Sequence, residues 1–294
     1  MKKKIFSKVF YISFKVTIFI FIIISYQFLE FFIIYKRKRK EQEKNEEIQE
    51  PDIQQKKRGG ITSALCVIAK QENKYIKEFV NHYKNLGINK IILYDNNEMH
   101  EENFNEILKD EIEDNYVKLI DFRGFSAPQK IAYDDCYERI RKDYDWIGFY
   151  DVDEYLHIDN FKNINKFLSQ TKFQNCTSIL INWKNYGDND NIYYEDKPLS
   201  IRFTKPFYFS KNFTDDILLR SAAKSLVRGG MKEINWQHFP HFLKGPGLCR
   251  PDGKEENEPL SFPKFTFSYL KHFVTKSLEE YIKKLKKGAV YKRR

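Results

Sequence analysis

The chain lacks the short sequence motifs that identify several large enzyme classes. No G-x-G-x-x-G follows the first apolar run, and neither G-x-x-x-x-G-K-[ST] nor G-x-S-x-G is present. A dinucleotide-binding fingerprint, a P-loop and the nucleophile elbow of an α/β-hydrolase are therefore excluded.

Cysteine is also scarce. The four cysteines are Cys66, Cys136, Cys176 and Cys249, and none lies at a paired or metal-ligand spacing. Cys66 and Cys136 are interpreted as small core residues. We therefore expect neither a zinc site nor a disulfide framework.

Positive charge is concentrated at one end of the chain, although the formal net charge is +10. Residues 1–60 hold 14 Lys+Arg and 7 Asp+Glu, whereas residues 61–294 hold 37 and 34. The basic excess surrounds an N-terminal hydrophobic segment, where a membrane surface is the favoured partner. No nucleic-acid partner is expected, because the rest of the chain is close to neutral for its size.

The hydrophobic segment at residues 12–35 follows a basic tail at residues 1–11. It exceeds the roughly 20 residues that a transmembrane helix needs, and Lys15 and Glu30 lie near its ends, where long side chains snorkel. A cleaved signal peptide is the alternative. No small-x-small cleavage site is present, and the apolar stretch is longer than the usual h-region. We expect an uncleaved transmembrane signal anchor.

The membrane orientation stays open, because basic residues precede the span and Lys36–Lys40 follow it. Residues 36–60 are almost wholly polar and charged, so they are predicted to form a flexible stem. An anchor, a stem and a domain at residues 61–294 are typical of a single-pass type II protein of the Golgi or secretory pathway in a eukaryotic cell. The sequons at 175–177 and 212–214 would be usable in such a lumen.

Apolar runs alternate with helical patterns from residue 61 onward. Four strands with three intervening helices indicate an α/β fold, with a mostly parallel sheet covered by helices on both faces. The strands are expected near residues 63–69, 88–94, 116–122 and 146–150, and the helices near 76–86, 101–110 and 128–143. Beyond these we expect a helix near 161–171, a strand at 177–183 and an amphipathic helix at 278–287.

The segment that follows the fourth strand carries Asp151 and Asp153. Residues two apart on an extended backbone point to the same side, so both carboxylates can converge on one point. Oxygen ligands of this kind suit Mg²⁺ or Mn²⁺. Ligands of open α/β sheets bind beyond the carboxyl ends of the strands, where Asp95 also lies, at the end of the second strand. Asp-x-Asp alone is common by chance. The position of these aspartates at the carboxyl ends of predicted strands is what favours a metal site.

Several segments together resemble glycosyltransferase family 92 and its family-2-like bacterial relatives. They are Ala69–Asn73, Tyr94–Asn97, Trp146–Leu156, Lys224–Arg228 and His272–Glu280. The resemblance covers about residues 61–291. It implies a GT-A fold, a nucleotide-sugar donor and a divalent metal ion, Mn²⁺ or Mg²⁺, held by the aspartate pair.

The resemblance also implies roles for single residues. Asp151, Asp153 and His272 would hold the metal ion, with Asp151 near the donor ribose as well. Asp95 and Glu72 would lie at the nucleoside. An inverting transfer needs a carboxylate base, for which Asp188 is the candidate, although an ordinary turn residue is the alternative.

Lys224 and Arg228 could assist at the diphosphate. The default interpretation of these two residues is that they belong to a charged face in contact with solvent. The leading hypothesis is a membrane-anchored, metal-dependent transfer of sugar from a nucleotide-sugar, favouring UDP-sugars, to a glycan or glycoconjugate. A catalytically inactive, GT-A-fold glycan-binding membrane protein is the first alternative. A basic protein acting at anionic membranes or nucleic acid through Lys36–Lys40 is the second.

Overall fold

The structure is a computed structural model that describes residues 60–124, 129–206, 223–232, 234–237, 242–243, 245–257 and 263–287. The expected basic tail at 1–11, the anchor at 12–35 and the stem at 36–60, except Gly60, lie outside these residues. Among the helices of the described part, none is long and apolar enough to cross a membrane.

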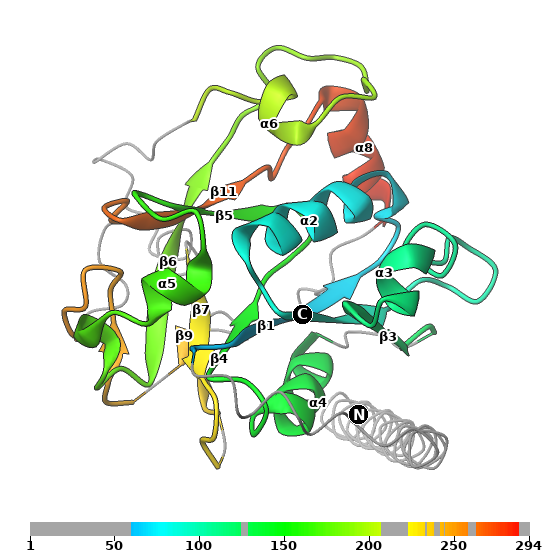
Figure 1. Cartoon of the computed structure of the whole chain (residues 1–294). Helices are drawn as coiled ribbons and strands as arrows, with labels where there is room; N and C mark the ends of the chain where they lie inside the picture. The colour runs from blue at the N-terminus through cyan, green and yellow to red at the C-terminus, as the bar shows by residue number, and fades with distance from the viewer. Residues whose placement is uncertain are drawn as a thin grey trace, which may run out of the picture. The chain divides into compact units, whose positions relative to one another are not determined.

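Nine strands of the described residues form one mixed sheet (Figure 1). The order is β3-β2-β1-β4-β7-β6-β11-β5, and β10 pairs with β6 outside this path. The strands are β1 Ser63–Ala69, β2 Lys90–Asp95, β3 Val117–Asp121, β4 Trp146–Phe149, β5 Glu154–Ile158, β6 Ser178–Asn185, β7 Ala223–Arg228, β10 Leu248–Cys249 and β11 Ser268–His272. A separate pair joins β8 Trp236–Gln237 to β9 Phe242–Leu243.

The first four strands confirm the expected parallel half of the sheet. β1 pairs in parallel with β2 and with β4, and β2 pairs in parallel with β3. The second half is mixed, because β7 runs antiparallel to β4 and β6, and β5 runs antiparallel to β11. β11 runs parallel to β6. The α/β prediction is thus correct, and the parallel character is strongest in the N-terminal half.

Helices pack on both faces of the parallel half. Neighbouring residues of a strand point to opposite faces. Leu65 and Val67 of β1 share one core cluster with Phe79 and Val80 of α2 (Asn73–Leu86). Cys66, between them, points to the other face and is bonded to α4 (Gln129–Ile140). The α2 helix ends at Gly87, which takes the left-handed conformation common at helix C-termini.

The cysteine expectation is wrong. Cys66 is bonded to Cys136, and Cys176 to Cys249, with Cα–Cα distances of 6.0 and 5.8 Å. The partners are 70 and 73 residues apart in sequence, so no spacing pattern reveals them. The fold brings them together by packing α4 on β1 and by pairing β10 with β6.

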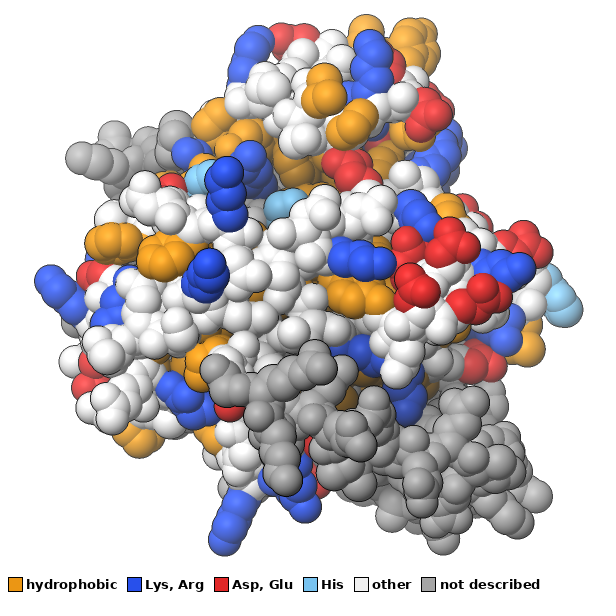
Figure 2. All heavy atoms as spheres, viewed as in Figure 1, with side chains coloured by type: hydrophobic (Ala, Val, Ile, Leu, Met, Phe, Trp, Pro, Cys, Tyr) orange, Lys and Arg blue, Asp and Glu red, His pale blue; other side chains and the backbone are white. Residues whose placement is uncertain are grey.

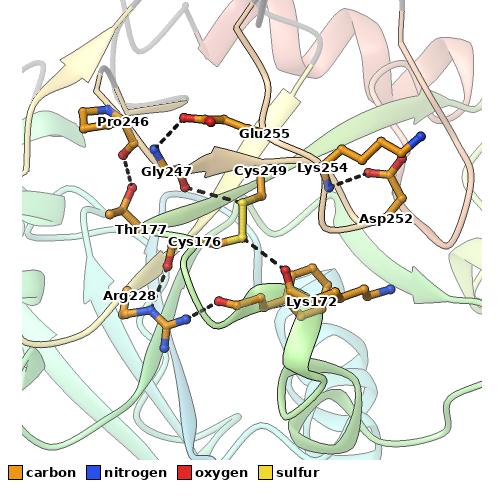
Figure 3. The surroundings of a disulfide bond; sticks show 11 residues. Lys172, Cys176, Thr177, Arg228, Pro246, Gly247, Cys249, Asp252, Lys254 and Glu255 are labelled. Atoms are coloured by element: carbon orange, nitrogen blue, oxygen red, sulfur yellow. Dashed lines mark hydrogen bonds between the residues drawn. A yellow bond between two sulfur atoms is a disulfide. The ribbon is translucent and has the colours of Figure 1, made fainter.

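The second disulfide joins Cys249 of β10 to Cys176, which lies two residues before the start of β6 (Figure 3). Beside it, the Arg228 guanidinium donates from Nε to the Cys176 carbonyl at 2.7 Å, and the Thr177 hydroxyl donates to the Pro246 carbonyl at 2.8 Å. Arg228 also lies 4.2 Å from the centre of the Trp146 ring. Arg228 is therefore a structural residue and not part of a solvated charged face.

The shorter helices differ in extent from their predicted ranges. The polar helix expected near 101–110 is α3, Lys109–Glu113. The helix expected near 161–171 is divided into α5, Ile164–Leu168, and a 3₁₀ turn, Thr171–Phe173. A short α6 covers Leu199–Arg202, and α8 covers Leu278–Lys287 as predicted.

Candidate functional site

Strand ends from both halves of the sheet meet at one edge. β1, β2, β4, β6 and β11 all end there, and the antiparallel strands β5 and β7 begin there. His272 ends β11, and its backbone is in register with Glu154 of β5 on one side and Asn185 of β6 on the other. The Asp151–Asp153 turn follows β4 directly. Residues distant in sequence are thus placed side by side.

Asp153, Glu154 and His272 form a group that can hold a metal ion. One ligand atom from each lies within 4.8 Å of the others. His272 Nε2 lies 3.8 Å from Asp153 Oδ1. Among the described residues, no hydrogen-bond donor reaches Glu154 Oε1, although this atom is buried. Two carboxylates and one imidazole suit a divalent transition metal such as Mn²⁺.

The His272 imidazole is prepared to act as a ligand. Its Nδ1 lies 2.9 Å from the Asn185 side-chain oxygen, so Nδ1 carries the proton and donates it. Nε2 then presents its lone pair toward Asp153. Burial lowers the pKa of His272 to about 4, against the attraction of Asp153, so the ring is neutral at pH 7. A neutral imidazole oriented by a second hydrogen bond is the usual form of a metal-ligating histidine.

The Asp153 carboxylate already has a cationic neighbour from α8. Lys284 Nζ donates to Asp153 Oδ2 at 2.9 Å and to the Val274 carbonyl at 3.1 Å. Burial alone would raise the pKa of Asp153, but the charge of Lys284, joined at low pH by the protonated His272 ring, outweighs it and holds that pKa well below its usual range. Asp153 is therefore ionised across the physiological pH range.

Asp151 is held by a different set of donors. Gln129 Nε2 and the Tyr133 hydroxyl each lie 3.1 Å from Oδ1, and Lys224 Nζ lies 2.9 Å from Oδ2. Its side chain stays 35 % exposed. Asp151 thus faces solvent beside the metal-ligand group, with one oxygen bound to a lysine.

Lys224 is completely buried in β7, so the solvated reading of this residue is wrong. Its Nζ lies between Asp151 and Glu154, 3.7 Å from Glu154 Oε1. Burial opposes its charge, but the two carboxylates outweigh burial and raise the pKa of Lys224 above its ordinary value. Burial also raises the pKa of Glu154. The site therefore contains a fixed positive charge beneath its aspartates.

The two residues predicted near the nucleoside lie on other elements of the same edge. Asp95 ends β2 and is buried, and its Oδ1 accepts hydrogen bonds from the Asn97 backbone at 3.0 Å and side chain at 2.8 Å. Burial raises the pKa of Asp95. Glu72 precedes α2, and Lys276 Nζ donates to it at 3.4 Å. Lys276 follows β11 by four residues, which links Glu72 to the His272 segment.

Asp188 lies in the loop that follows β6 and is exposed. Its Oδ1 accepts a hydrogen bond from the Asp190 backbone at 3.1 Å, as in an Asx turn. Asn189 and Asp190 have φ values of 53° and 62°. These contacts are those of an ordinary turn residue. Asp188 nevertheless lies close to the site in sequence, because only two residues separate it from Asn185, the hydrogen-bond partner of His272.

Two residues of the site, Glu154 and Asn185, were missed in the sequence, and Lys224 was named as a candidate without its burial being foreseen. Lys224 had a usable signal, because a lysine within the apolar run 222–227 must find a partner if that run is a buried strand. Glu154 and Asn185 had none, since their roles depend on the pairing of β5, β6 and β11.

The family model described as Glycosyltransferase family 92 matches residues 61–289 of this chain. It is 24 % identical to a family 92 protein of Ricinus communis over 34 % of this chain and 18 % of the relative. It is 23 % identical to one of Arabidopsis thaliana over 45 % of this chain and 23 % of the relative. In these alignments the chain spans less than a quarter of the curated relatives' length.

The chain therefore belongs to glycosyltransferase family 92. Among solved structures it is similar to S. aureus TarS residues 1–349, at 15 % identity and a TM-score of 0.36, over 57 % of this chain and 47 % of that chain. The same TarS segment in complex with UDP-GlcNAc matches 42 % of this chain and 35 % of its own, at 14 % identity and a TM-score of 0.34.

Proposed function

We propose that this protein transfers a sugar from a nucleotide-sugar donor, a UDP-sugar in the first instance, to a hydroxyl group of a glycan or glycoconjugate. Membership of family 92 supports the reaction class. The observation that carries the proposal for this chain is the convergence of Asp153, Glu154 and His272 at the carboxyl edge of the sheet. Ligands of α/β sheets bind at this edge.

The ligand group fits a divalent ion, and we propose Mn²⁺ or Mg²⁺ held by Asp153 and His272, with the orphaned Glu154 oxygen beside them. Such an ion, when bound, neutralises the charge that develops on a diphosphate leaving group. We propose that Asp151 contacts the donor through the exposed side of its carboxylate. Asp95 and Glu72 are proposed to lie near the nucleoside of the donor.

The chain's own lysines offset the negative charge of the two aspartates beside the proposed leaving group. Lys224 fixes the position of Asp151, and Lys284 lies on the Asp153 carboxylate. Preorganised charges of this kind stabilise a transition state without reorganisation during the reaction. For an inverting transfer, a carboxylate accepts the proton of the acceptor hydroxyl as it attacks the anomeric carbon. Asp188 is the residue to test in that role.

The disulfides support a location in an oxidising compartment. Two buried disulfides are expected in secretory or extracellular proteins and are rare in the cytosol. Asn175, the acceptor of one sequon, is exposed. Together with the hydrophobic segment at 12–35, these features favour a single-pass membrane protein whose domain lies in a secretory-type lumen.

The two lysines favour one second candidate function. Because Lys224 and Lys284 already pair with Asp151 and Asp153, the site can bind an anionic or sugar ligand without a metal ion. A catalytically inactive glycan-binding protein would use the site in this way.

A donor screen separates the two functions. The full chain is incubated with UDP- and GDP-sugars and Mn²⁺, and nucleotide release is measured for the wild type, for Asp153→Ala and for Asp110→Asn as an exposed control whose side chain is 83 % exposed. A transferase should release nucleotide from at least one donor, and Asp153→Ala should abolish that release while Asp110→Asn retains it. Full activity of Asp153→Ala would refute the proposed site, and no release from any donor would favour the binding protein.

A further inference from the structure

The apolar face of α8 points away from the protein. Leu278, Tyr281, Ile282 and Leu285 share one face by their spacing, and their exposed fractions are 48 %, 38 %, 43 % and 63 %. A surface helix of a globular protein normally turns such a face toward the core. In α8 the buried position is instead Glu280, which is 9 % exposed.

Polar contacts fix α8 in this inverted orientation. Ser277 and Glu280 form a capping box, in which the Glu280 backbone donates to the Ser277 hydroxyl oxygen at 3.4 Å and the Ser277 backbone donates to Glu280 Oε2 at 3.1 Å. The Ser277 hydroxyl also donates to Glu280 Oε2 at 2.5 Å. Arg202 of α6 donates to the same carboxylate. One turn later, Lys284 binds Asp153. The face that carries Glu280 and Lys284 is therefore committed to the protein, and the apolar face is left outside.

A neighbouring loop extends the exposed apolar surface. The Glu279 backbone donates to the Ile192 carbonyl at 2.9 Å, which places this loop beside the start of α8. Ile192 and Tyr193 are 56 % and 72 % exposed. Figure 2 shows hydrophobic side chains, together with basic and some acidic ones, over the part of the surface where Figure 1 places α6 and α8. We call Ile192, Tyr193, Leu278, Tyr281, Ile282 and Leu285 the α8 patch.

The α8 patch is accompanied by positive charge. Lys283 and Lys286 are exposed on the same helix, and Lys283 also pairs with Glu279 one turn earlier. The ten residues of α8 hold four Lys and two Glu. Apolar and tyrosine side chains flanked by lysines are typical of a helix that lies in the interface of a bilayer. Each basic residue near an anionic lipid surface adds to the attraction.

We propose that the α8 patch docks on the anionic surface of a lipid bilayer. A second copy of the chain is a poorer fit, because a symmetric contact through this patch would bring two basic helices together. Since Lys284 of α8 also binds Asp153, docking would hold the site beside the membrane. This inference goes beyond the proposed sugar transfer and does not depend on which sugar is moved.

The test measures how closely α8 approaches lipid in the full chain. Since the four native cysteines are paired, Ile282→Cys introduces a single thiol that takes an environment-sensitive fluorophore. Met99→Cys, at a 56 % exposed apolar residue on the loop after β2, is the matched control. Both labelled chains are reconstituted into nanodiscs that contain doxyl-labelled lipid. The bilayers are phosphatidylcholine alone or a mixture with about 30 % phosphatidylglycerol.

Docking predicts that doxyl lipid quenches the label at position 282 about threefold more than the label at position 99 in the anionic bilayer. The difference should shrink in phosphatidylcholine alone and in the Lys283→Gln/Lys286→Gln background. Equal quenching at both positions in anionic bilayers would overturn the proposal. It would also be overturned if the position 282 label were shielded from lipid and this shielding appeared only as the protein concentration rose, which indicates a contact between copies.

Discussion

The buried ammonium of Lys224 lies 2.9 Å from Asp151, the first aspartate after β4. This pair joins the antiparallel strand β7 to the turn that carries Asp153, and it neutralises one of the three carboxylates gathered at the edge of the sheet. The site is therefore built on an internal charge balance among its own residues as well as on any ion it binds.

Replacing Lys224 with Met should destabilise the fold. The change leaves Asp151 and Glu154 without their buried cation, and removing one partner of such a pair costs about 3 kcal/mol. Urea unfolding of the full chain measures the loss. The double variant Lys224→Met/Asp151→Asn should recover part of it, because one of the two carboxylates left without a cation is then uncharged. A Lys224→Met chain as stable as the wild type would contradict the charge balance described here.

Acidification should destabilise the protein through His82. Its Nε2 lies 3.0 Å from the Leu156 carbonyl, and burial lowers the pKa of His82 to about 4. The unfolded chain takes up this proton near pH 6.5, so it binds more protons than the folded chain between these values. The contribution of His82 to the free energy of unfolding is therefore complete above pH 6.5. It falls by about 3 kcal/mol as the pH is lowered toward 4.

The His82→Gln variant is the control for this pH dependence, since the amide keeps a donor for the Leu156 carbonyl but does not titrate. Its unfolding free energy, measured by urea titration from pH 7 to 4, should fall less steeply than that of the wild type. Identical slopes would show that His82 does not titrate abnormally.

Removing the second disulfide should weaken the fold without removing the site. Cys176→Ala/Cys249→Ala opens a crosslink between positions 73 residues apart, and the chain-entropy account assigns about 4 kcal/mol to a loop of this size. Thermal unfolding of the double variant, compared with the wild type under oxidising conditions, gives the loss. A double variant that unfolds at the same midpoint temperature as the oxidised wild type would show that the Cys176–Cys249 bond contributes nothing.

Asn185→Ala should weaken metal binding although Asn185 is not among the proposed ligands. It fixes the His272 ring through Nδ1, and loss of such a partner typically lowers metal affinity about 10- to 100-fold. Mn²⁺ titration followed by electron paramagnetic resonance measures the affinity. Asn175→Ala, at an exposed asparagine, should bind Mn²⁺ as the wild type does. Equal affinity of Asn185→Ala and the wild type would remove His272 from the ligand set.

Sequence reasoning found the features that depend on local pattern. The alternation of apolar runs and helical spacing located β1 to β4, and the placement of Asp95 and Asp153 after strands put them at one edge. Features that depend on distant pairing were not accessible. Glu154 joins His272 only because β5 pairs with β11, and the cysteines meet only after α4 packs on β1 and β10 on β6. The amphipathic pattern of α8 was visible, but its inverted orientation follows from the Arg202–Glu280 and Lys284–Asp153 contacts.

The most direct test is calorimetric titration of UDP into the full chain, with and without Mn²⁺, for the wild type and for Asp153→Asn. A divalent-metal nucleotide-sugar site predicts that Mn²⁺ tightens UDP binding to the wild type at least about tenfold, and that Asp153→Asn loses this enhancement. UDP binding that is equally tight in both proteins and unaffected by Mn²⁺ would contradict the account.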